Sequence, residues 1–542
     1  MKVASVIGRV FALRELSAIY PIKADLSALP EYLNHLETQE LTILDTPDPE
    51  ISYLFKHIIT QEVAYNLLLF SQRRSLHRAI AEWYEQSFIH DSVMYYPVLA
   101  HHWKQADVPK KAIEYLAKSG EMAFRSGTYR EAIQFFSQAL ERTEATKDTS
   151  VSPLRKAYWL RLIGDAQIGL GDLEAARISF RKAVTTLKHP SPTNNFSVVF
   201  GLAWQWLIQS LHRRFPALFI GRLKDKDAEL QEVAQIYTHL GNINYLKLET
   251  LPMLYHTLAS LNLSEAGGSM SAGRVWALGS ASAILGFVPN HALAKHYAEK
   301  ALHASEQVNN PRSQMWTYLA VGVYKLGIAE WEPARASLLK MKELAMSASD
   351  SRLEGDAEVV LAGMEYFRGA DFESSHQGYK NLMAQAKKSG NLLHLTWGTY
   401  GVALLQLIRG EFEQVLQNVK DGEALDATHI NVAQLFAIRA YAHWRLNQVD
   451  DAIKNISMSL ELLMPLPQTV YSLLATYRLL TQVTLEIWMG GKTFDVEGWR
   501  TSADIKSKVT VLLNLQKKFK PRLPDGRTRV FIFSWHAKLA EW

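Results

Sequence analysis

The sequence predicts an all-α solenoid of paired helices that follows a small domain containing both helices and strands. Short motifs with a turn glycine and regularly spaced alanines recur along the middle of the chain. Apolar residues in these motifs repeat at helical spacing, whereas those near residue 50 alternate as in strands. The composition, with 48% hydrophobic and 21% charged residues, is typical of a folded globular protein.

The chain of 542 residues is long enough for several domains or for one extended solenoid. Its net charge of +5 is small for this length and gives no strong attraction to nucleic acid or to a membrane surface. The absence of cysteine excludes disulfides, thiol catalysis and Cys-ligated zinc. This composition suits a reducing compartment, so we expect a cytoplasmic protein.

Residues 1–90 mix helix and strand signals. Leucines at helical spacing predict a helix over 25–40, and alternating apolar residues on both sides of Thr46-Pro47-Asp48-Pro49 predict a β-hairpin. A helical pattern follows the hairpin. Helix, helix, hairpin and helix is the element order of a winged helix, so we expect a small α+β domain of that kind here.

Residues 91–465 contain the repeats. In the two clearest copies a turn glycine precedes an aromatic residue or leucine, and then the pattern Ala-x-x-x-Phe-x-x-Ala. These positions are Gly127, Tyr129, Ala132, Phe136 and Ala139, and Gly171, Leu173, Ala176, Phe180 and Ala183. The spacing is typical of the tetratricopeptide repeat, in which small residues let two antiparallel helices approach and the large ring fills the gap.

Weaker copies continue toward the C-terminus. Equivalent positions at 334, 375, 415 and 452 are 41, 40 and 37 residues apart, longer than the minimal repeat of about 34. Residues 190–260 fit the pattern poorly. The uncharged stretch 275–294 is interrupted by Pro289 and predicts a buried helix pair, because a membrane helix needs about 20 mostly apolar residues. Residues 466–542 look like further helical repeats that stop within a repeat.

Four segments resemble one family. They are ASVIGRVF (4–11), FKHIITQEVAYNLLL (55–69), RRSLHRAIAEWYE (73–85) and the run from LAHHWKQ to GTYREAI (99–133). They resemble the region after the nucleotide-binding core in AAA/STAND-type ATPases with tetratricopeptide repeats, often fused to class III adenylate or guanylate cyclases, including relatives of soluble adenylyl cyclase. The resemblance implies that 1–90 is the winged-helix remnant of such an ATPase. It is good to about residue 140 and diffuse beyond.

The chain departs from that family where catalysis is concerned. Gly491-Lys492-Thr493 looks like the end of a phosphate-binding loop, but Glu486 stands where the first glycine is required, and no strand precedes it. The paired metal-binding aspartates of a cyclase cannot be placed. We therefore expect no enzymatic activity, no cofactor and no bound metal for this chain.

His57 is the one candidate site residue, a weak nucleotide sensor that requires an ATPase core. It stands where the predicted strand meets a helix, and in STAND switches a histidine at such a joint contacts the nucleotide diphosphate. The resemblance implies that role for His57, although Ile58 replaces the aspartate often found next to it. The alternative is a histidine that caps the helix or packs against it.

Two other groups have simpler interpretations. Arg73, Arg74, His77 and Arg78 form a basic cluster, but the helix expected at 25–40 carries four acidic residues and no lysine or arginine. Phosphates would repel that helix, so nucleic acid is not an expected partner. The neighbouring His101 and His102 point about 100° apart on a helix, so we do not expect them to share a metal.

These observations favour a non-catalytic interaction and regulatory module, whose repeats bind protein partners on a concave surface and couple that binding to a signalling ATPase or cyclase. One alternative is a C-terminal fragment of a multidomain cyclase with an ATP-binding AAA/STAND domain. A winged-helix transcriptional regulator is the third hypothesis, and it lacks a basic reading helix.

Overall fold

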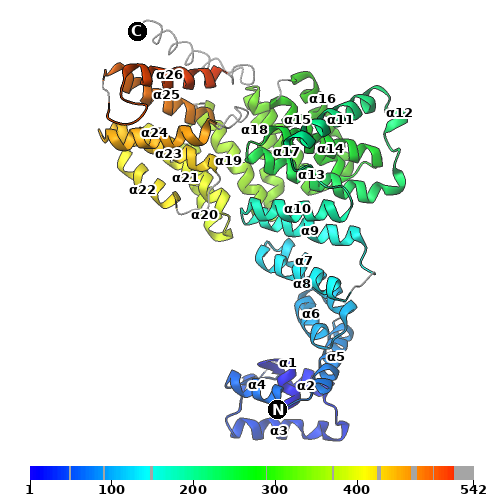
Figure 1. Ribbon diagram of the computed structural model, residues 1–542. Helices are drawn as coiled ribbons and strands as arrows, with labels where there is room; N and C mark the ends of the chain where they lie inside the picture. Colours follow the sequence, from blue (N-terminus) through cyan, green and yellow to red (C-terminus); the bar gives the residue numbers. More distant parts are fainter. Residues whose placement is uncertain are drawn as a thin grey trace. The chain divides into compact units, whose positions relative to one another are not determined.

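The computed structural model describes residues 1–47, 50–88, 92–146, 150–287, 290–368, 371–423, 429–464, 473–491 and 494–517 (Figure 1). Most of them lie in α-helices, which are numbered α1 to α26. The chain forms two compact units, Met1–Ala166 and a second that begins at Gln167.

The first unit begins with a small α+β arrangement. Its elements are α1 (Lys2–Ile7), β1 (Val10–Ala12), α2 (Leu13–Ile19), the 3-10 helix η1 (Lys23–Ala28), α3 (Leu29–Thr38), β2 (Thr42–Thr46), β3 (Ser52–Phe55), α4 (Ile58–Asn66) and α5 (Phe70–Ser87). The antiparallel sheet has the strand order β1-β3-β2. Phe11 and Phe55 pack in its core with Leu29 and Leu33. The predicted α+β domain is therefore confirmed.

The hairpin is where the sequence predicts it, with Ile43 opposite Leu54 in the β2–β3 pair. Part of its turn, Asp48-Pro49, lies outside the described residues. The helix predicted over 25–40 is confirmed over Leu29–Thr38, but the residues before it form the 3-10 helix η1. The α-helix begins only at Leu29, and the 3-10 turn before it leaves Leu26 37% exposed. Pro30 explains the break, because proline has no N–H and clashes with the carbonyl four residues earlier.

Helix pairs begin in the first unit and follow the predicted spacing. After the 3-10 helix η2 (Ser92–Tyr95) come α6 (Tyr96–Gln105), α7 (Pro109–Arg125) and α8 (Tyr129–Ala145). A Cβ placed on Gly120 of α7 would lie 2.8 Å from the Phe136 ring of α8, so glycine permits the contact. Gly127 in the turn has a φ of 77°, a left-handed conformation that favours glycine.

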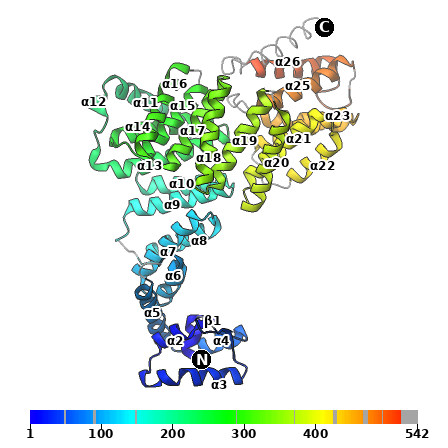
Figure 2. The ribbon, with the colours of Figure 1, turned by 180° about the vertical axis from the view of Figure 1, so that it is seen from behind.

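The second unit continues the array of antiparallel helix pairs (Figure 2). After the end of α9 (Pro153–Gly169), and α10 (Leu173–Thr186), the regular pairs are α13 (Asp227–Leu246) with α14 (Thr250–Gly267), α15 (Ala272–Phe287) with α16 (His291–Val308), α17 (Pro311–Gly327) with α18 (Trp331–Ser347), α19 (Ser351–Arg368) with α20 (Phe372–Ser389), α21 (Leu392–Arg409) with α22 (Phe412–Glu423), α23 (His429–Arg445) with α24 (Val449–Leu463), and α25 (Leu473–Met489) with α26 (Ser502–Lys517). The predicted helical solenoid is confirmed.

Residues 190–260, which fit the repeat pattern poorly, contain one irregular part and one regular part. The irregular part is the long helix α11 (Asn195–Arg214), the short α12 (Pro216–Phe219) and the 3-10 helix η3 (Lys224–Lys226). The regular part is α13, which pairs with α14. Helix α11 packs on α14 from outside the pair series, which explains why the repeat pattern fails there.

The solenoid of the second unit returns on itself. The turn before α10 meets the start of α21, where the backbone N–H of Leu392 donates to the carbonyl of Leu170 over 3.4 Å. A Cβ on Gly171 would lie 2.8 Å from the backbone nitrogen of Leu393. A second closure joins Leu248, after α13, to the cluster that contains Ile430 of α23. Segments about 200 residues apart in sequence therefore enclose one interior.

The uncharged stretch 275–294 forms most of α15 and the start of α16, and its Val275, Leu278 and Leu285 belong to a buried core cluster with residues of neighbouring helices. Among the described helices, none has the length and apolar character to cross a membrane. Gly490 and Gly491 follow the end of α25. Lys492, Thr493 and the last repeat-like segment, 518–542, lie outside the described residues.

Replacing Gly322 with alanine should destabilise the second unit by about 1–3 kcal/mol, the usual cost of overpacking a filled core. The added Cβ would lie 2.9 Å from the buried Leu338 side chain. Gly327 at the end of the same helix has no atom within 4 Å of its Cβ position, so Gly327→Ala is the matched control. Denaturant midpoints of both variants test this, and equal midpoints would contradict it.

Candidate functional site

The interior of the second unit contains a cavity of about 270 Å³. Its wall comes mainly from the first helix of each consecutive pair, namely α13, α15, α17, α19, α21 and α23. Ile168 and Leu393, from the two segments that close the solenoid, also line it. The cavity is thus a product of the repeat arrangement and of its closure.

Most of the wall is apolar or aromatic. The aromatic residues that line it are Tyr245, Trp316, Tyr366, Phe367, Tyr379, Trp397 and Tyr400. Burial raises the pKa of the Tyr400 and Tyr366 hydroxyls, so both stay neutral at physiological pH. Apolar walls with a few placed polar groups are characteristic of ligand-binding cavities.

The cavity wall contains one cluster of charged and polar side chains, formed by Arg352, Asp356 and His394. Asp356 of α19 accepts a hydrogen bond of 2.8 Å from Nε2 of His394 and pairs with Arg352 Nη1 over 3.2 Å. Burial alone raises the pKa of Asp356, but the hydrogen bond and charge of His394, together with the charge of Arg352, outweigh burial and lower it. Asp356 is therefore an ionised carboxylate whose charge is already balanced.

Local structure brings this group together. Arg352 and Asp356 are one turn apart on α19, as an i,i+4 pair. Asn391 caps α21, its Oδ1 accepting from the backbone N–H of His394 over 3.0 Å. Gly355 leaves room for the imidazole, since a Cβ there would lie 2.5 Å from Nδ1 of His394. The cap and the glycine together direct His394 onto Asp356.

Asn431 of α23 adds an unused donor to the wall. The residue is 5% exposed, and within the described part of the chain its Nδ2 atom has no hydrogen-bond partner. Gln434 lines the cavity less than one turn later on the same helix. A buried amide without a partner costs free energy, and a ligand carbonyl that accepted its proton would recover that cost.

His57 lies where the sequence places it, between β3 and α4 in the first unit. It occupies the N-cap position of α4 with extended backbone angles, and its side chain makes no capping hydrogen bond. The residue is exposed. The imidazole therefore neither caps the helix nor packs in the core, and it is accessible to another molecule.

The predicted basic cluster on α5 does not form one basic surface. Arg73 stacks over the Tyr65 ring at 4.5 Å. Arg74 pairs with Asp107 over 2.7 Å, and Arg78 with Glu82 over 2.8 Å. His77 is buried rather than exposed. The charges of Arg74 and Arg78 are paired with carboxylates and His77 is buried, so the cluster offers little unpaired positive charge to a polyanion.

His77 instead meets the two histidines of α6. Its Nδ1 lies 2.8 Å from Nδ1 of His102, and Tyr65 Oη lies 3.0 Å from its Nε2. Burial, and then the neighbouring positive groups, lower the pKa of His77 to about 3 and that of His102 to about 2. Both rings are therefore neutral and hydrogen-bonded to each other.

His77, His101 and His102 offer ligand atoms within 4.8 Å of one another, so these residues could in principle hold a metal. Nitrogens around zinc lie about 3.3 Å apart, given bonds of ~2.0–2.1 Å in tetrahedral geometry. The 2.8 Å separation in the His77–His102 pair is that of a hydrogen bond. In this arrangement His77 and His102 form a buried polar contact between α5 and α6, and His101 is exposed beside them.

Sequence reasoning missed the cavity group and the histidine pair. Asp356 and His394 are 38 residues apart, and no local motif joins them. His77 was assigned to the basic cluster because it shares a helix with three arginines. The available signal was a histidine at an apolar helical position, since Leu76 and Ile80 beside it are buried too.

Residues 162–186 match a family model described as "Tetratricopeptide repeat". The chain therefore contains such a repeat at α9–α10, the second of the two clear copies. An uncharacterized protein, R02095, of Rhizobium meliloti (strain 1021) is 28% identical over 208 residues. These are 38% of this chain and 20% of that protein, so the match spans about one fifth of that relative's length.

Several solved helical-repeat structures are similar at low identity. A Rap protein complexed with competence and sporulation factor has a TM-score of 0.42 and 12% identity, covering 68% of this chain and 100% of its own. Human IFIT1 with m7Gppp-AAAA has a TM-score of 0.42 and 11% identity, and the match covers 84% of this chain and 92% of IFIT1. A STAND protein with a tetratricopeptide repeat sensor from Pyrococcus horikoshii has a TM-score of 0.35 and 11% identity, and the match covers 100% of this chain and 62% of that protein. At these scores the assignment of fold rests on the helix pairs themselves.

Acidification should destabilise the α5–α6 contact. Folding lowers the pKa of His77 and His102, so below about pH 6.5 the unfolded chain binds protons that the folded chain does not. Stability is complete above that pH and falls toward pH 3, by roughly 1.4 kcal/mol per pH unit for each histidine. Hydrogen exchange in α5 and α6 at pH 7 and pH 5, corrected for intrinsic rates, measures the loss.

The variant His102→Asn should reduce this pH dependence, because asparagine keeps a polar atom near Nδ1 but does not titrate. His35→Asn is the matched control, since His35 is exposed on α3. An unchanged pH dependence in the His102 variant would contradict the assignment.

Proposed function

We propose that the chain is a non-catalytic interaction and regulatory module whose second unit binds a segment of a protein partner in its interior cavity. The cavity is the observation that carries this proposal. It is built from six consecutive first helices, it is largely apolar, and it holds a donor without a partner. The tetratricopeptide repeat at 162–186 supports a protein-binding role.

The wall favours an uncharged, extended segment with apolar side chains. The carboxylate of Asp356 is already balanced by Arg352 and His394, so a charged ligand group would gain little there. Asn431 can donate to a peptide carbonyl, and the aromatic wall can bury side chains. An extended peptide supplies both kinds of group along its length.

The proposal includes coupling to a signalling ATPase or cyclase outside this chain. The resemblance over residues 1–140 supports it, and so does the order of elements from α1 to β3, which is that of a winged helix. His57, exposed at the end of β3, is the residue that we propose to sense the nucleotide when an ATPase core is present. Partner binding by the repeats would then bias the nucleotide state of that core.

The setting that we propose is the cytoplasm, and nucleic acid is not the proposed partner. Helix α3 stands where a winged helix reads DNA, and it carries Glu31 and Glu37 but no lysine or arginine. Such a helix would be repelled by phosphates. This composition leaves the transcriptional regulator as the weakest of the three hypotheses.

Peptides selected from a random library against the chain should bind in the cavity. We expect affinity to fall at least about tenfold in Ala320→Trp, whose indole would occupy the cavity, and also in Asn431→Ala, which removes the free donor. Titration calorimetry measures both changes. The control is Lys387→Ala on α20, a residue that does not line the cavity. Selected peptides that bind all variants equally would refute the proposal.

An immunoblot against the repeat region tests the coupling. If the ATPase core belongs to the same polypeptide, the endogenous protein should migrate well above the 61.4 kDa of this chain. His57→Ala in that larger protein should then alter nucleotide retention without changing stability, because the ring is exposed. A band at 61.4 kDa from a protein that copurifies with no ATPase would contradict the coupling but not the cavity.

A further inference from the structure

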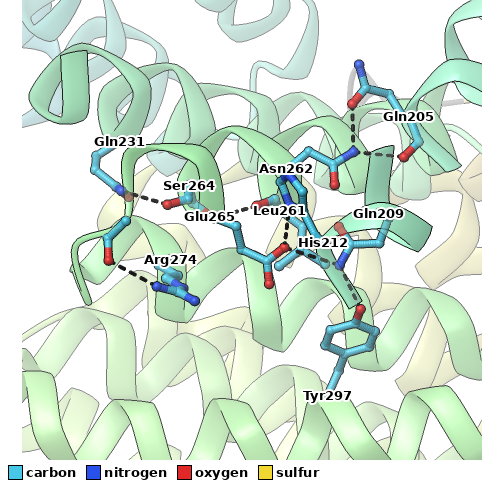
Figure 3. Close-up of polar contacts among 11 residues, drawn as sticks. Gln205, Gln209, His212, Gln231, Leu261, Asn262, Ser264, Glu265, Arg274 and Tyr297 are labelled. Carbon is cyan, nitrogen blue, oxygen red and sulfur yellow. Dashed lines mark hydrogen bonds and ion pairs between the residues drawn. The ribbon is translucent and has the colours of Figure 1, made fainter. Parts of the chain in front are cut away.

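Helix α11 differs from an ordinary amphipathic helix, because Gln209 and His212 are buried while most of its large apolar side chains are exposed. Gln209 Nε2 donates to Glu265 Oε2 over 3.2 Å, and His212 Nδ1 lies 2.9 Å from the same oxygen (Figure 3). Gln209 also bonds the hydroxyl of Tyr297 over 2.9 Å. Glu265, Gln209 and His212 are all at least nine-tenths buried.

A third contact fixes the same side of the helix. Nδ2 of Asn262 donates to both the backbone carbonyl and the side chain of Gln205, each over 2.8 Å (Figure 3). Gly201, one turn earlier, lets the Tyr255 ring of α14 approach, since a Cβ there would lie 2.8 Å away. Breaking such buried polar contacts is costly, so they hold α11 in one rotation about its axis.

This rotation leaves the apolar face of α11 in solvent. Phe196 is 83% exposed, Phe200 69% and Leu207 50%. These residues are spaced by four and seven positions, so they form one stripe along the helix, which Val199 and Trp204 widen. Helix α12 continues the apolar surface with Leu218, which is 70% exposed. Contiguous exposed apolar surface of this kind marks an interaction site.

Several basic residues come directly after the apolar stripe in the sequence. Between residues 213 and 226 the chain has five basic side chains and one acidic one, all exposed. The basic residues are Arg213, Arg214, Arg222, Lys224 and Lys226. From Asn195 to Leu211, in contrast, the helix carries no charged residue. The small net charge of the whole chain conceals this local concentration.

We propose that the α11–α12 segment docks on an anionic lipid surface. Apolar and aromatic residues on one face beside clustered lysine and arginine are the pattern of helices that lie in a membrane interface. Both ribbon views place α12, which follows α11, at the margin of the second unit (Figures 1 and 2). An exposed helix face needs no complementary groove when it enters a fluid lipid interface, whereas a protein partner would have to supply one.

Two other occupants are outcomes of the test. A second copy of the chain could cover the stripe, and an amphipathic helix of a partner protein could lie along it. Neither would require the basic residues, because the stripe itself is uncharged. Dependence on anionic lipid therefore separates the proposal from both.

The full chain should cosediment with vesicles of phosphatidylcholine and phosphatidylserine, and much less with phosphatidylcholine alone. The double variant Phe196→Glu, Phe200→Glu should lower the partition coefficient by at least about tenfold, because each ring contributes the burial of a large side chain. Arg213→Gln with Arg214→Gln should lower it by a smaller factor and weaken its salt dependence.

The matched control is Ile178→Glu with Leu339→Glu, which alters exposed aliphatic residues on α10 and α18. It should bind vesicles as the parent does. Circular dichroism should be unchanged in all variants, because the substituted side chains are exposed and the Glu265 contacts lie on the opposite side of α11. Sedimentation velocity without lipid reports self-association.

Three results would overturn the proposal. One is equal binding to neutral and anionic vesicles. Another is the absence of vesicle binding in a monomeric parent chain. The third is a dimer that the Phe196 and Phe200 substitutions dissociate without any effect on lipid, which would assign the stripe to a second copy. None of these measurements involves the cavity, so its role would stand or fail separately.

Discussion

The whole solenoid depends on the close approach of two helices within each pair. A small residue on one helix faces a large side chain on the next, as Gly120 faces Phe136 and Gly322 faces Leu338. Each pair buries most of its remaining apolar surface against neighbouring pairs, so the stack turns steadily. The first helices then face the interior, and the cavity follows from that arrangement.

Buried polar groups give this regular scaffold its particular features. Arg352, Asp356 and His394 place a balanced charge in an aromatic wall, and a helix cap sets the position of the imidazole. Glu265 has a different effect, because it turns α11 so that apolar residues face outward. Polar contacts thus determine both what the interior can accept and what the outer surface presents.

The features that could be predicted from the sequence are those that depend on local patterns of residues. The hairpin and the helix pairs depend on residues a few positions apart, so their types and approximate limits could be derived. The helix predicted at 25–40 was given too early a start, because the spacing of the leucines was given more weight than Pro30. His57 lies at the joint of strand and helix that the sequence indicates, and its role as a nucleotide sensor stays a prediction, whereas the cavity was not foreseen. The cavity is lined by residues far apart in sequence, such as Ile168 and Leu393, so no local pattern indicates it. In the same way, His77 contacts His102 only because α5 packs against α6.

Closure of the solenoid also changes how the second unit folds. An open solenoid can nucleate anywhere and lose its end repeats one at a time, because each repeat contacts only its neighbours. Here Leu170 meets Leu392, and Leu248 meets Ile430, across long stretches of chain. These contacts form only after a large loop has closed, which raises the contact order and slows folding. They also bind early and late repeats into one cooperative block, so the middle of the array cannot fray independently of its beginning.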